Sequence, residues 1–183
     1  PPPHTPPTSQ SSAASDVYKR QPQVGEAPAD MALRLARAKA EAGIAGAADL
    51  VLAADTVVAV DGRSLGKPAD ERDCLAMLDA LSGRSHKVLT GVALRGPERT
   101  VTALSATDVY FREISRDEAL AYWQSGEPSD KAGAYAIQGL GGVFVERIEG
   151  SYSGVVGLPV FETVTLLREA GLDVVRKWTA HGR

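Results

Sequence analysis

The chain has 183 residues, a length typical of one domain, and 44% of them are hydrophobic, which is enough for a buried core. Its formal net charge of -3 does not indicate a nucleic-acid or membrane-surface protein, and its single cysteine, Cys74, excludes an intramolecular disulfide and argues against a zinc–cysteine site. Because its apolar runs are too short to span a bilayer and its N-terminus lacks the hydrophobic segment of a signal peptide, we expect a cytoplasmic protein.

Residues 1–21 differ in composition from the rest of the chain. The segment is rich in Pro, Ser and Thr and has almost no aliphatic side chains. Because such a composition cannot bury a core, we expect a disordered or non-native tail here and a single domain over residues 22–183.

The first predicted helix covers residues 29–42 and ends at Gly43. Apolar residues at helical spacing, Leu35 among them, form its buried stripe, and Lys39 falls at the edge of that stripe. A lysine there either meets a partner or ligand, or extends its charged end into water, and the pattern leaves both interpretations open.

Asp55 interrupts an apolar run over residues 50–58 that predicts a strand buried on both faces. An unpaired ion in such a strand is costly, so a carboxylate there needs a reason. At a strand end and followed by the hydroxyl of Thr56, it is placed as a general base or a metal ligand would be. The alternative is that Asp55 caps a turn or pairs with a lysine purely for structure.

The rest of the chain alternates strands with helices. We expect, in chain order, a hairpin turn at Asp61-Gly62, a helix over 70–81, strands over 86–94 and 101–111, a helix over 115–124 with a capping box, a strand over 143–148, a helix beginning near Pro159 and a short strand over 173–175. Interspersed helices and strands, some of them in hairpins, predict an α/β domain with a mixed, twisted sheet.

Two glycine-rich segments resemble nucleotide-binding loops but do not match their spacing. Residues 62–68 are one residue short of a Walker A loop, and Pro68 stands where a hydroxyl residue would hold magnesium. Residues 139–142 lack the dinucleotide-binding spacing and precede a predicted strand instead of a helix. The three histidines are scattered, so we assign none of them to catalysis or to a metal.

The candidate functional residues that remain are a carboxylate, three lysines, a hydroxyl and an amide. They are Asp55, Lys39, Lys67, Lys131, Thr56 and Gln138. Lysine is a point-charge partner for phosphate, and a carboxylate among lysines can bind a divalent cation or activate water. Because three scattered lysines also arise by chance, this pattern alone points only weakly to a phosphorylated ligand.

Six motifs carry a more specific signal. They are Ala53-Ala-Asp-Thr-Val-Val58, Gly66-Lys-Pro68, Leu81-Ser-Gly83, Thr90-Gly91, Asp130-Lys-Ala-Gly-Ala-Tyr-Ala-Ile-Gln-Gly139, and Gly150-Ser-Tyr152 with Val155-Val-Gly-Leu-Pro159. In this order and at this spacing they resemble the Maf family of nucleoside triphosphate pyrophosphatases, over residues 28–172.

The resemblance implies a fold and a reaction. The fold would have two lobes around a cleft, as in inosine triphosphate pyrophosphatases. The reaction would be hydrolysis of a nucleoside triphosphate to the monophosphate and pyrophosphate, assisted by a divalent metal (Mg²⁺ or Mn²⁺) whose protein ligands the sequence leaves unknown. A homodimer is also implied, and neither nucleic acid nor a membrane is an expected partner.

The resemblance also assigns roles to single residues. Asp55 matches the family's proton acceptor, and Lys39 and Lys67 match lysines that contact the phosphates. Thr56 and Gln138 match positions that set base preference. The 130–139 motif is similar to that of the subgroup acting on dTTP and UTP, and an amide at Gln138 can present a donor and an acceptor to a pyrimidine edge.

The chain departs from the family at its start. The family opens with a strand and a Ser-x-Ser-x-Arg-Arg loop that grips phosphates before a helix, and residues 1–21 contain none of this. A family glutamate near this region has no clear counterpart, although Glu26 lies nearby. We therefore expect a domain that lacks its first strand and helix, with two alternatives to the enzyme: a nucleotide-binding regulator of septum formation without catalysis, or an inactive N-terminally truncated fragment.

Overall fold

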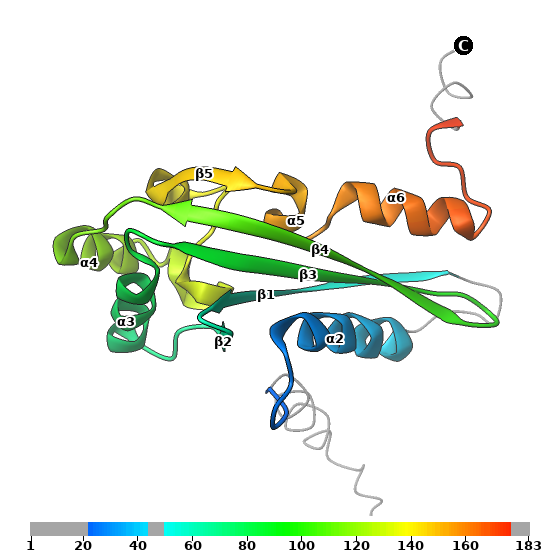
Figure 1. Cartoon of the computed structure of the whole chain (residues 1–183), viewed down its shortest axis with the longest axis horizontal. Helices are drawn as coiled ribbons and strands as arrows, with labels where there is room; N and C mark the ends of the chain where they lie inside the picture. The colour runs from blue at the N-terminus through cyan, green and yellow to red at the C-terminus, as the bar shows by residue number, and fades with distance from the viewer. Residues whose placement is uncertain (1–21, 44–49, 177–183) are drawn as a thin grey trace, which may run out of the picture.

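The computed structural model describes residues 22–43 and 50–176, and the predicted tail over residues 1–21 lies outside them. Its sheet has five strands in the order β2-β1-β3-β4-β5 (Figure 1). The strands are β1 (Val51–Val60), β2 (Arg63–Leu65), β3 (Ser85–Arg95), β4 (Thr100–Phe111) and β5 (Val145–Glu149). The helices are α2 (Pro28–Ala42), α3 (Glu71–Leu81), α4 (Arg116–Gln124), α5 (Tyr152–Val156) and α6 (Val160–Glu169), with 3₁₀ turns η1 (Glu127–Asp130), η2 (Ala132–Ala134) and η3 (Leu140–Phe144).

The expected α/β class is confirmed, but the sheet differs in one respect. Every pairing among the described strands is antiparallel, so the parallel pairs of a mixed sheet are not found there. The β1–β2 hairpin turns at Asp61 and Gly62, which both have positive φ (49° and 75°). Two positive φ values define the type I′ turn that matches the strand twist, and the Asp-Gly pair is typical of it.

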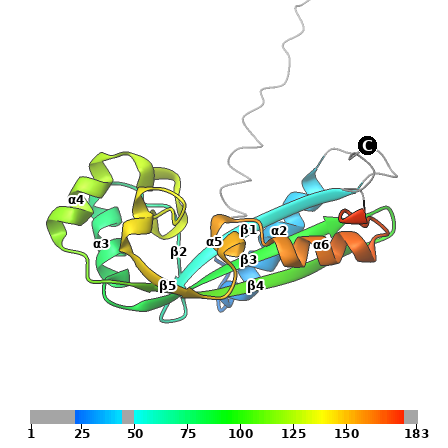
Figure 2. The same ribbon diagram turned by 90° about the horizontal axis from the view of Figure 1, so that it is seen from above.

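The two faces of the sheet are covered by different helices (Figure 1). Helix α2 packs on one face against β1 and β3, and α5 and α6 pack on the other face. Figure 2 shows α3 and α4 gathered at one end of the long strands, with α2 and α6 towards the other end, which corresponds to the two expected lobes.

Side chains along β1 alternate between these two faces, as in any strand. Val57 and Ala59 pack with Leu35 of α2, whereas Val58 and Val60 join the core cluster beneath α3 and α4. The alternation continues through Asp55 and Thr56, which lie in the middle of this ten-residue strand and not at its end as predicted.

Three local features differ from what the sequence predicted. Residues 173–175 form no strand, and α5 was not predicted, because five residues that include a glycine carry no helical periodicity. Strand β5 begins at Val145 because the residues before it form η3. The other predicted elements lie within two residues of their observed ends, and the capping box of Ser115 and Glu118 is present. Among the described residues, no helix has both the length and the apolar character needed to cross a membrane.

His86 lies buried in the core at the α3–α4 end. Its Nε2 is 2.8 Å from the hydroxyl of Tyr135, and its ring meets Phe111 edge-on with centroids 4.8 Å apart. The Nδ1 atom has no hydrogen-bond partner among the described residues. Burial lowers the pKa of His86 from 6.5 to about 4, and the charge of Asp108 offsets this only partly, so the imidazole is neutral at pH 7.

We expect His86 to make the protein less stable in mild acid. Between pH 6.5 and about 4 the unfolded chain binds a proton that the folded chain does not, so the free energy of unfolding falls by up to roughly 3 kcal/mol as the pH drops through this window. Urea unfolding measured from pH 7.5 to 4.5 should show that the free energy of unfolding falls more steeply with decreasing pH for the wild type than for His86→Gln. His4 and His181 are present in both proteins, so their contributions to the pH dependence cancel in the comparison. An equal pH dependence of the free energy of unfolding in the two proteins would contradict the prediction.

Candidate functional site

Asp55 and Lys39 form an ion pair on the α2 face of the sheet. Lys39 Nζ lies 2.5 Å from Asp55 Oδ1 and donates a second bond to the carbonyl of Ala54 at 3.1 Å. The side chain of Asp55 is 16% exposed and that of Lys39 is 42% exposed. The pair is therefore open to a ligand from solvent and is not sealed beneath apolar side chains.

A glycine brings α2 close enough for this contact. Gly91 of β3 is the cross-strand partner of Asp55 and faces α2. A Cβ at Gly91 would lie 2.5 Å from the carbonyl oxygen of Ala32, which is closer than real atoms come. Only glycine allows the helix backbone to rest on the sheet here, and Lys39 follows two turns later on the same helix.

A second ion pair stands beside the first. Arg34 donates from Nε to Glu26 Oε1 at 2.5 Å and from Nη2 to Oε2 at 2.7 Å. The hydrogen bonds to Glu26 raise the pKa of Arg34, and the negative charge of Asp55 raises it further. Sequence patterns did not single out Arg34, because one arginine on an amphipathic helix is usually a solvated charge.

Thr56 projects to the opposite face of β1, towards α5. Its Oγ1 lies 2.9 Å from Oγ1 of Thr90, its cross-strand partner, and Thr90 donates to the carbonyl of Gly154 at 2.7 Å. Adjacent positions of one strand thus hold a carboxylate on one face and a hydroxyl on the other.

Thr56 lines a small pocket, here called the β1–α5 pocket. Its walls are Thr56 and Val58 of β1, Val88 of β3, residues 130–132 and 135–138, and Val155 and Val156 of α5. Its volume of about 140 Å³ is below the range of pockets that enclose a drug-sized ligand and suits a single ring. Gln138 and Lys131 both line it, so the structure brings these predicted residues together with Thr56.

The 131–138 wall is held against β1 by a glycine and a carboxylate. Gly133 has a φ of 69°, donates to the carbonyl of Gly66 at 2.9 Å, and packs so closely on Val58 that a Cβ would lie 2.7 Å from it. The carboxylate of Glu127 accepts hydrogen bonds from Tyr122 Oη at 2.6 Å and from the amides of Leu140 and Gly141 at 2.8 and 3.0 Å.

Lys67 follows the end of β2, where Gly66 accepts a hydrogen bond from the amide of Gly133. The β1–β2 register ends at Val58↔Leu65, and continued by two residues it would set Lys67 beside Thr56. Lys67 is exposed, and its charge acts on Asp130 of the pocket: the bond from Lys131 lowers the pKa of Asp130 most, and Lys67 lowers it further.

The predicted residues therefore form two groups on opposite faces of β1. Lys39 and Asp55 occupy one face, and Thr56 and Gln138 occupy the other, while Lys67 follows β2 and its charge acts on Asp130 of the β1–α5 pocket. Of the described strands, β2 pairs with β1 only from Val58 to Val60, so the edge beside Asp55 and Thr56 carries no strand. A ligand placed at this edge can contact both faces.

A metal ion would have few protein ligands here. The described residues contain no group of three or more His, Cys, Asp or Glu side chains arranged to hold one. Magnesium often takes only one or two carboxylates and completes its shell with water and substrate phosphates. Asp55, with one oxygen on Lys39 and the second available, fits such a site.

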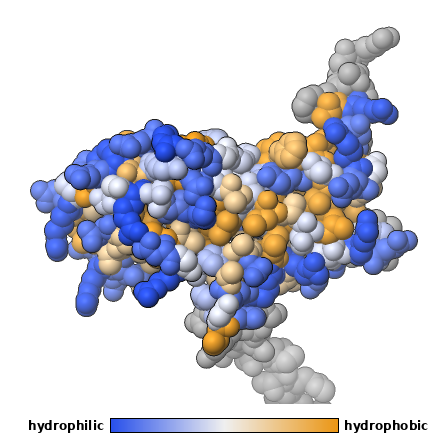
Figure 3. Space-filling model, viewed as in Figure 1, coloured by the Kyte–Doolittle hydropathy of each residue, from blue (hydrophilic) through white to orange (hydrophobic). Residues whose placement is uncertain are grey.

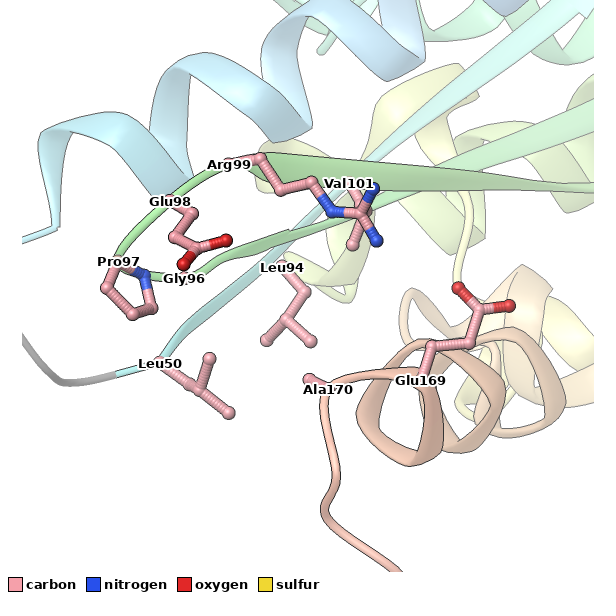
Figure 4. Close-up of a pocket in the computed structure, with 9 residues that line it drawn as sticks. All are labelled: Leu50, Leu94, Gly96, Pro97, Glu98, Arg99, Val101, Glu169 and Ala170. Carbon is pink, nitrogen blue, oxygen red and sulfur yellow. The ribbon is translucent and has the colours of Figure 1, made fainter.

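Another pocket, of about 210 Å³, lies between the β3–β4 turn and the end of α6 (Figure 4). It contains one cation, Arg99, and two carboxylates, Glu98 and Glu169, beside apolar residues such as Leu50 and Leu94. Its charge balance opposes a polyanion, so the edge of β1 is the better candidate for a phosphorylated ligand.

Comparison with known proteins agrees with the resemblance in the sequence. The sequence pattern of the Maf-like protein family matches this chain over residues 6–170. A dTTP/UTP pyrophosphatase of Saccharophagus degradans is 55% identical over 152 residues, which cover 80% of this chain and 72% of that protein. The dTTP/UTP pyrophosphatases of Methylobacillus flagellatus (55% identical, 79% of this chain and 74% of that protein) and Pseudoalteromonas translucida (53%, 78% and 77%) are similarly alike.

We expect Glu127→Gln to loosen the wall that carries Gln138. The carboxylate now accepts hydrogen bonds from three donors, and the new NH₂ group would face one of them without an acceptor between the two. An unsatisfied polar group of this kind costs about 1–3 kcal/mol. Urea unfolding should show this loss, and nucleotide KM should rise. Glu146→Gln, on the exposed side of β5, is the matched control and should change stability by less than about 0.5 kcal/mol. Equal stability of the two variants would rule out the bracing role.

Proposed function

This chain belongs to the family of Maf-like proteins, and we infer from this membership, from its relatives and from the edge of β1 that it hydrolyses a nucleoside triphosphate to the monophosphate and pyrophosphate. We propose dTTP and UTP as the substrates, since relatives at 53–55% identity carry that activity in their names. The observation that carries the proposal is the solvent-accessible Lys39–Asp55 pair, one residue along β1 from the Thr56 pocket.

Asp55 is the proposed proton acceptor. Its oxygen that faces away from Lys39 orients a water molecule for in-line attack on the α-phosphorus and takes up the proton that the water loses. The bond between the α-phosphorus and the bridging oxygen breaks, and pyrophosphate leaves. A base of this kind contributes about a hundred- to ten-thousandfold to the rate.

The cations around this edge are proposed to bind the triphosphate. Lys39 already lies at the carboxylate, Lys67 follows β2, and the Glu26 carboxylate holds Arg34 in place beside the Lys39–Asp55 pair. Phosphate oxygens are charge-assisted acceptors for all three side chains. Positioned cations stabilise the charge that develops on the leaving pyrophosphate, which is how most phosphoryl-transfer catalysis is achieved.

The β1–α5 pocket is proposed to hold the base. Its size suits one ring, and Val58, Val88 and Val155 provide apolar walls against which a ring can pack. Thr56 and Gln138 supply the polar contacts at its rim. A divalent cation, Mg²⁺ or Mn²⁺, is proposed to bind Asp55 together with the triphosphate, where it would neutralise phosphate charge.

Hydrolysis is favoured over the alternatives of a nucleotide-binding regulator and an inactive fragment, because the relatives are named as pyrophosphatases. The Asp55 pair also supports catalysis over binding alone. A protein that only binds nucleotide has no need for an accessible carboxylate among phosphate-binding cations, since its charge repels the ligand.

A second copy of this chain is proposed to cover the surface formed by α5, α6 and the residues between them. Apolar side chains stand exposed there: Tyr152 (52%), Val156 (42%), Leu158 (44%), Val160 (55%) and Phe161 (78%). Figure 3 shows apolar area in the region of α6. A group of exposed apolar residues like this one more often marks an interaction surface than a surface that stays in contact with solvent.

We expect Asp55→Asn to reduce kcat for pyrophosphate release from UTP by about a hundredfold or more, because the amide has the shape of the carboxylate but accepts no proton. Asp61→Asn, at an exposed turn of the same hairpin, is the matched control and should keep the wild-type rate. Wild-type activity should also disappear in EDTA and return with Mg²⁺. Undiminished turnover by Asp55→Asn, with circular dichroism showing a folded protein, would refute the assignment.

Phe161→Glu should make the protein monomeric if α5 and α6 form the dimer surface, because a carboxylate would be buried without a partner. Light scattering after size exclusion gives the mass directly. Val143→Glu changes an equally apolar residue, 66% exposed, on η3, and should leave the dimer intact. A monomeric wild type at tens of micromolar would count against the proposed surface.

A further inference from the structure

Thr90 occupies a position from which it controls the hydrogen bonding of the β1–α5 pocket. It lies on β3, fully buried, and contacts no solvent itself. We propose that Thr90 is a positioning residue that makes Thr56 a pure hydrogen-bond acceptor, and that the pocket thereby selects uracil and thymine over cytosine. This inference rests on the proposed hydrolysis of a pyrimidine nucleotide and adds the residue that sets base choice.

The argument follows the two hydroxyl protons. Thr90 Oγ1 lies 2.7 Å from the carbonyl oxygen of Gly154, and a carbonyl can only accept, so the one proton of Thr90 points there. Thr90 Oγ1 is also 2.9 Å from Thr56 Oγ1. With the proton of Thr90 committed to Gly154, the bond between the two hydroxyls must be donated by Thr56. The chain of bonds therefore runs from Thr56 through Thr90 to Gly154.

This leaves Thr56 with lone pairs alone for a ligand. A free threonine hydroxyl rotates to donate or accept as its partner requires. The hydroxyl of Thr56 can only accept from a ligand, because its proton is bonded to Thr90. Gln138, which lines the same pocket from the exposed 138–140 segment, can turn its amide and present either polarity. The protein thus fixes the hydroxyl of Thr56 in advance as a hydrogen-bond acceptor for a ligand in the pocket.

A hydrogen-bond acceptor at Thr56 suits only those pyrimidine bases that have a hydrogen-bond donor at ring position 3. Uracil and thymine carry an N–H at position 3, flanked by two carbonyls, and can donate to an acceptor at Thr56. Neutral cytosine has a bare lone pair at the same ring position, so two acceptors would face each other without a proton between them. Sites that leave a buried polar group unpaired with the wrong substrate discriminate strongly against it.

Thr90 also ties α5 to the sheet, so a variant must separate base choice from simple loosening of α5. Loosening would lower kcat/KM for every nucleotide by a similar factor. Loss of polarity control would instead change the ratio of kcat/KM for UTP to that for CTP. The ratio is therefore the quantity to measure.

The experiment compares pyrophosphate release from UTP and CTP by the wild type, Thr90→Val and Thr90→Ser. Valine keeps the shape of threonine and removes its hydroxyl, which frees Thr56 to donate to cytosine. We expect the wild type to prefer UTP, Thr90→Val to reduce the UTP:CTP ratio by about tenfold or more, and Thr90→Ser to keep it.

A second pair of variants tests the route of the effect. Because Thr90 acts through Thr56, adding Thr90→Val to a Thr56→Val protein should not change the ratio further. The inference is overturned if the wild type accepts CTP as well as UTP, if Thr90→Val keeps the wild-type ratio, or if it shifts the ratio equally in the Thr56→Val background. Absence of pyrophosphate release from every nucleotide by the wild type would instead overturn the proposed function.

Discussion

The site depends on the alternation of side chains along β1. Asp55 and Thr56 are consecutive, so a strand must send one to each face of the sheet. Their cross-strand partners on β3 are consecutive too, and each is matched to its face: Gly91 lies beneath α2, and Thr90 bonds to α5. A shift of this register by one residue would exchange the carboxylate and the hydroxyl and disconnect both groups.

The two faces are assembled by different physical means. On the α2 side, the absence of a side chain at Gly91 lets a helix backbone rest on the sheet, and charge completes the site when Lys39 meets Asp55. On the α5 side, small polar groups in hydrogen-bonded series connect Thr56 and Thr90 to α5. One face thus carries the Lys39–Asp55 ion pair, and the other carries the hydrogen-bonded hydroxyls of Thr56 and Thr90 beside the β1–α5 pocket.

The 131–138 wall of the β1–α5 pocket is held in place by hydrogen bonds to residues outside the pocket, Glu127 and His86. Glu127 accepts three hydrogen bonds, and these outweigh its burial, so that the pKa of Glu127 is lowered and the carboxylate stays ionised. Tyr135, another wall residue, meets the buried imidazole of His86. Hydrogen bonds to Glu127 and His86 behind the pocket therefore help to position the segment that carries Gln138 and Lys131, as is typical of a loop on a rigid support.

The sequence by itself determined the local features and the identities of the candidate residues. The helix predicted over residues 29–42, the Asp61-Gly62 turn and the capping box of Ser115 follow from periodicity, φ preference and side-chain hydrogen bonding within a few residues. Only the tertiary structure decided that Lys39 meets Asp55, that Thr56 lies on the other face, and that Arg34, Thr90 and Glu127 take part. Those contacts join residues 5 to 64 positions apart, and helix or strand periodicity does not encode them, because they arise from packing between elements.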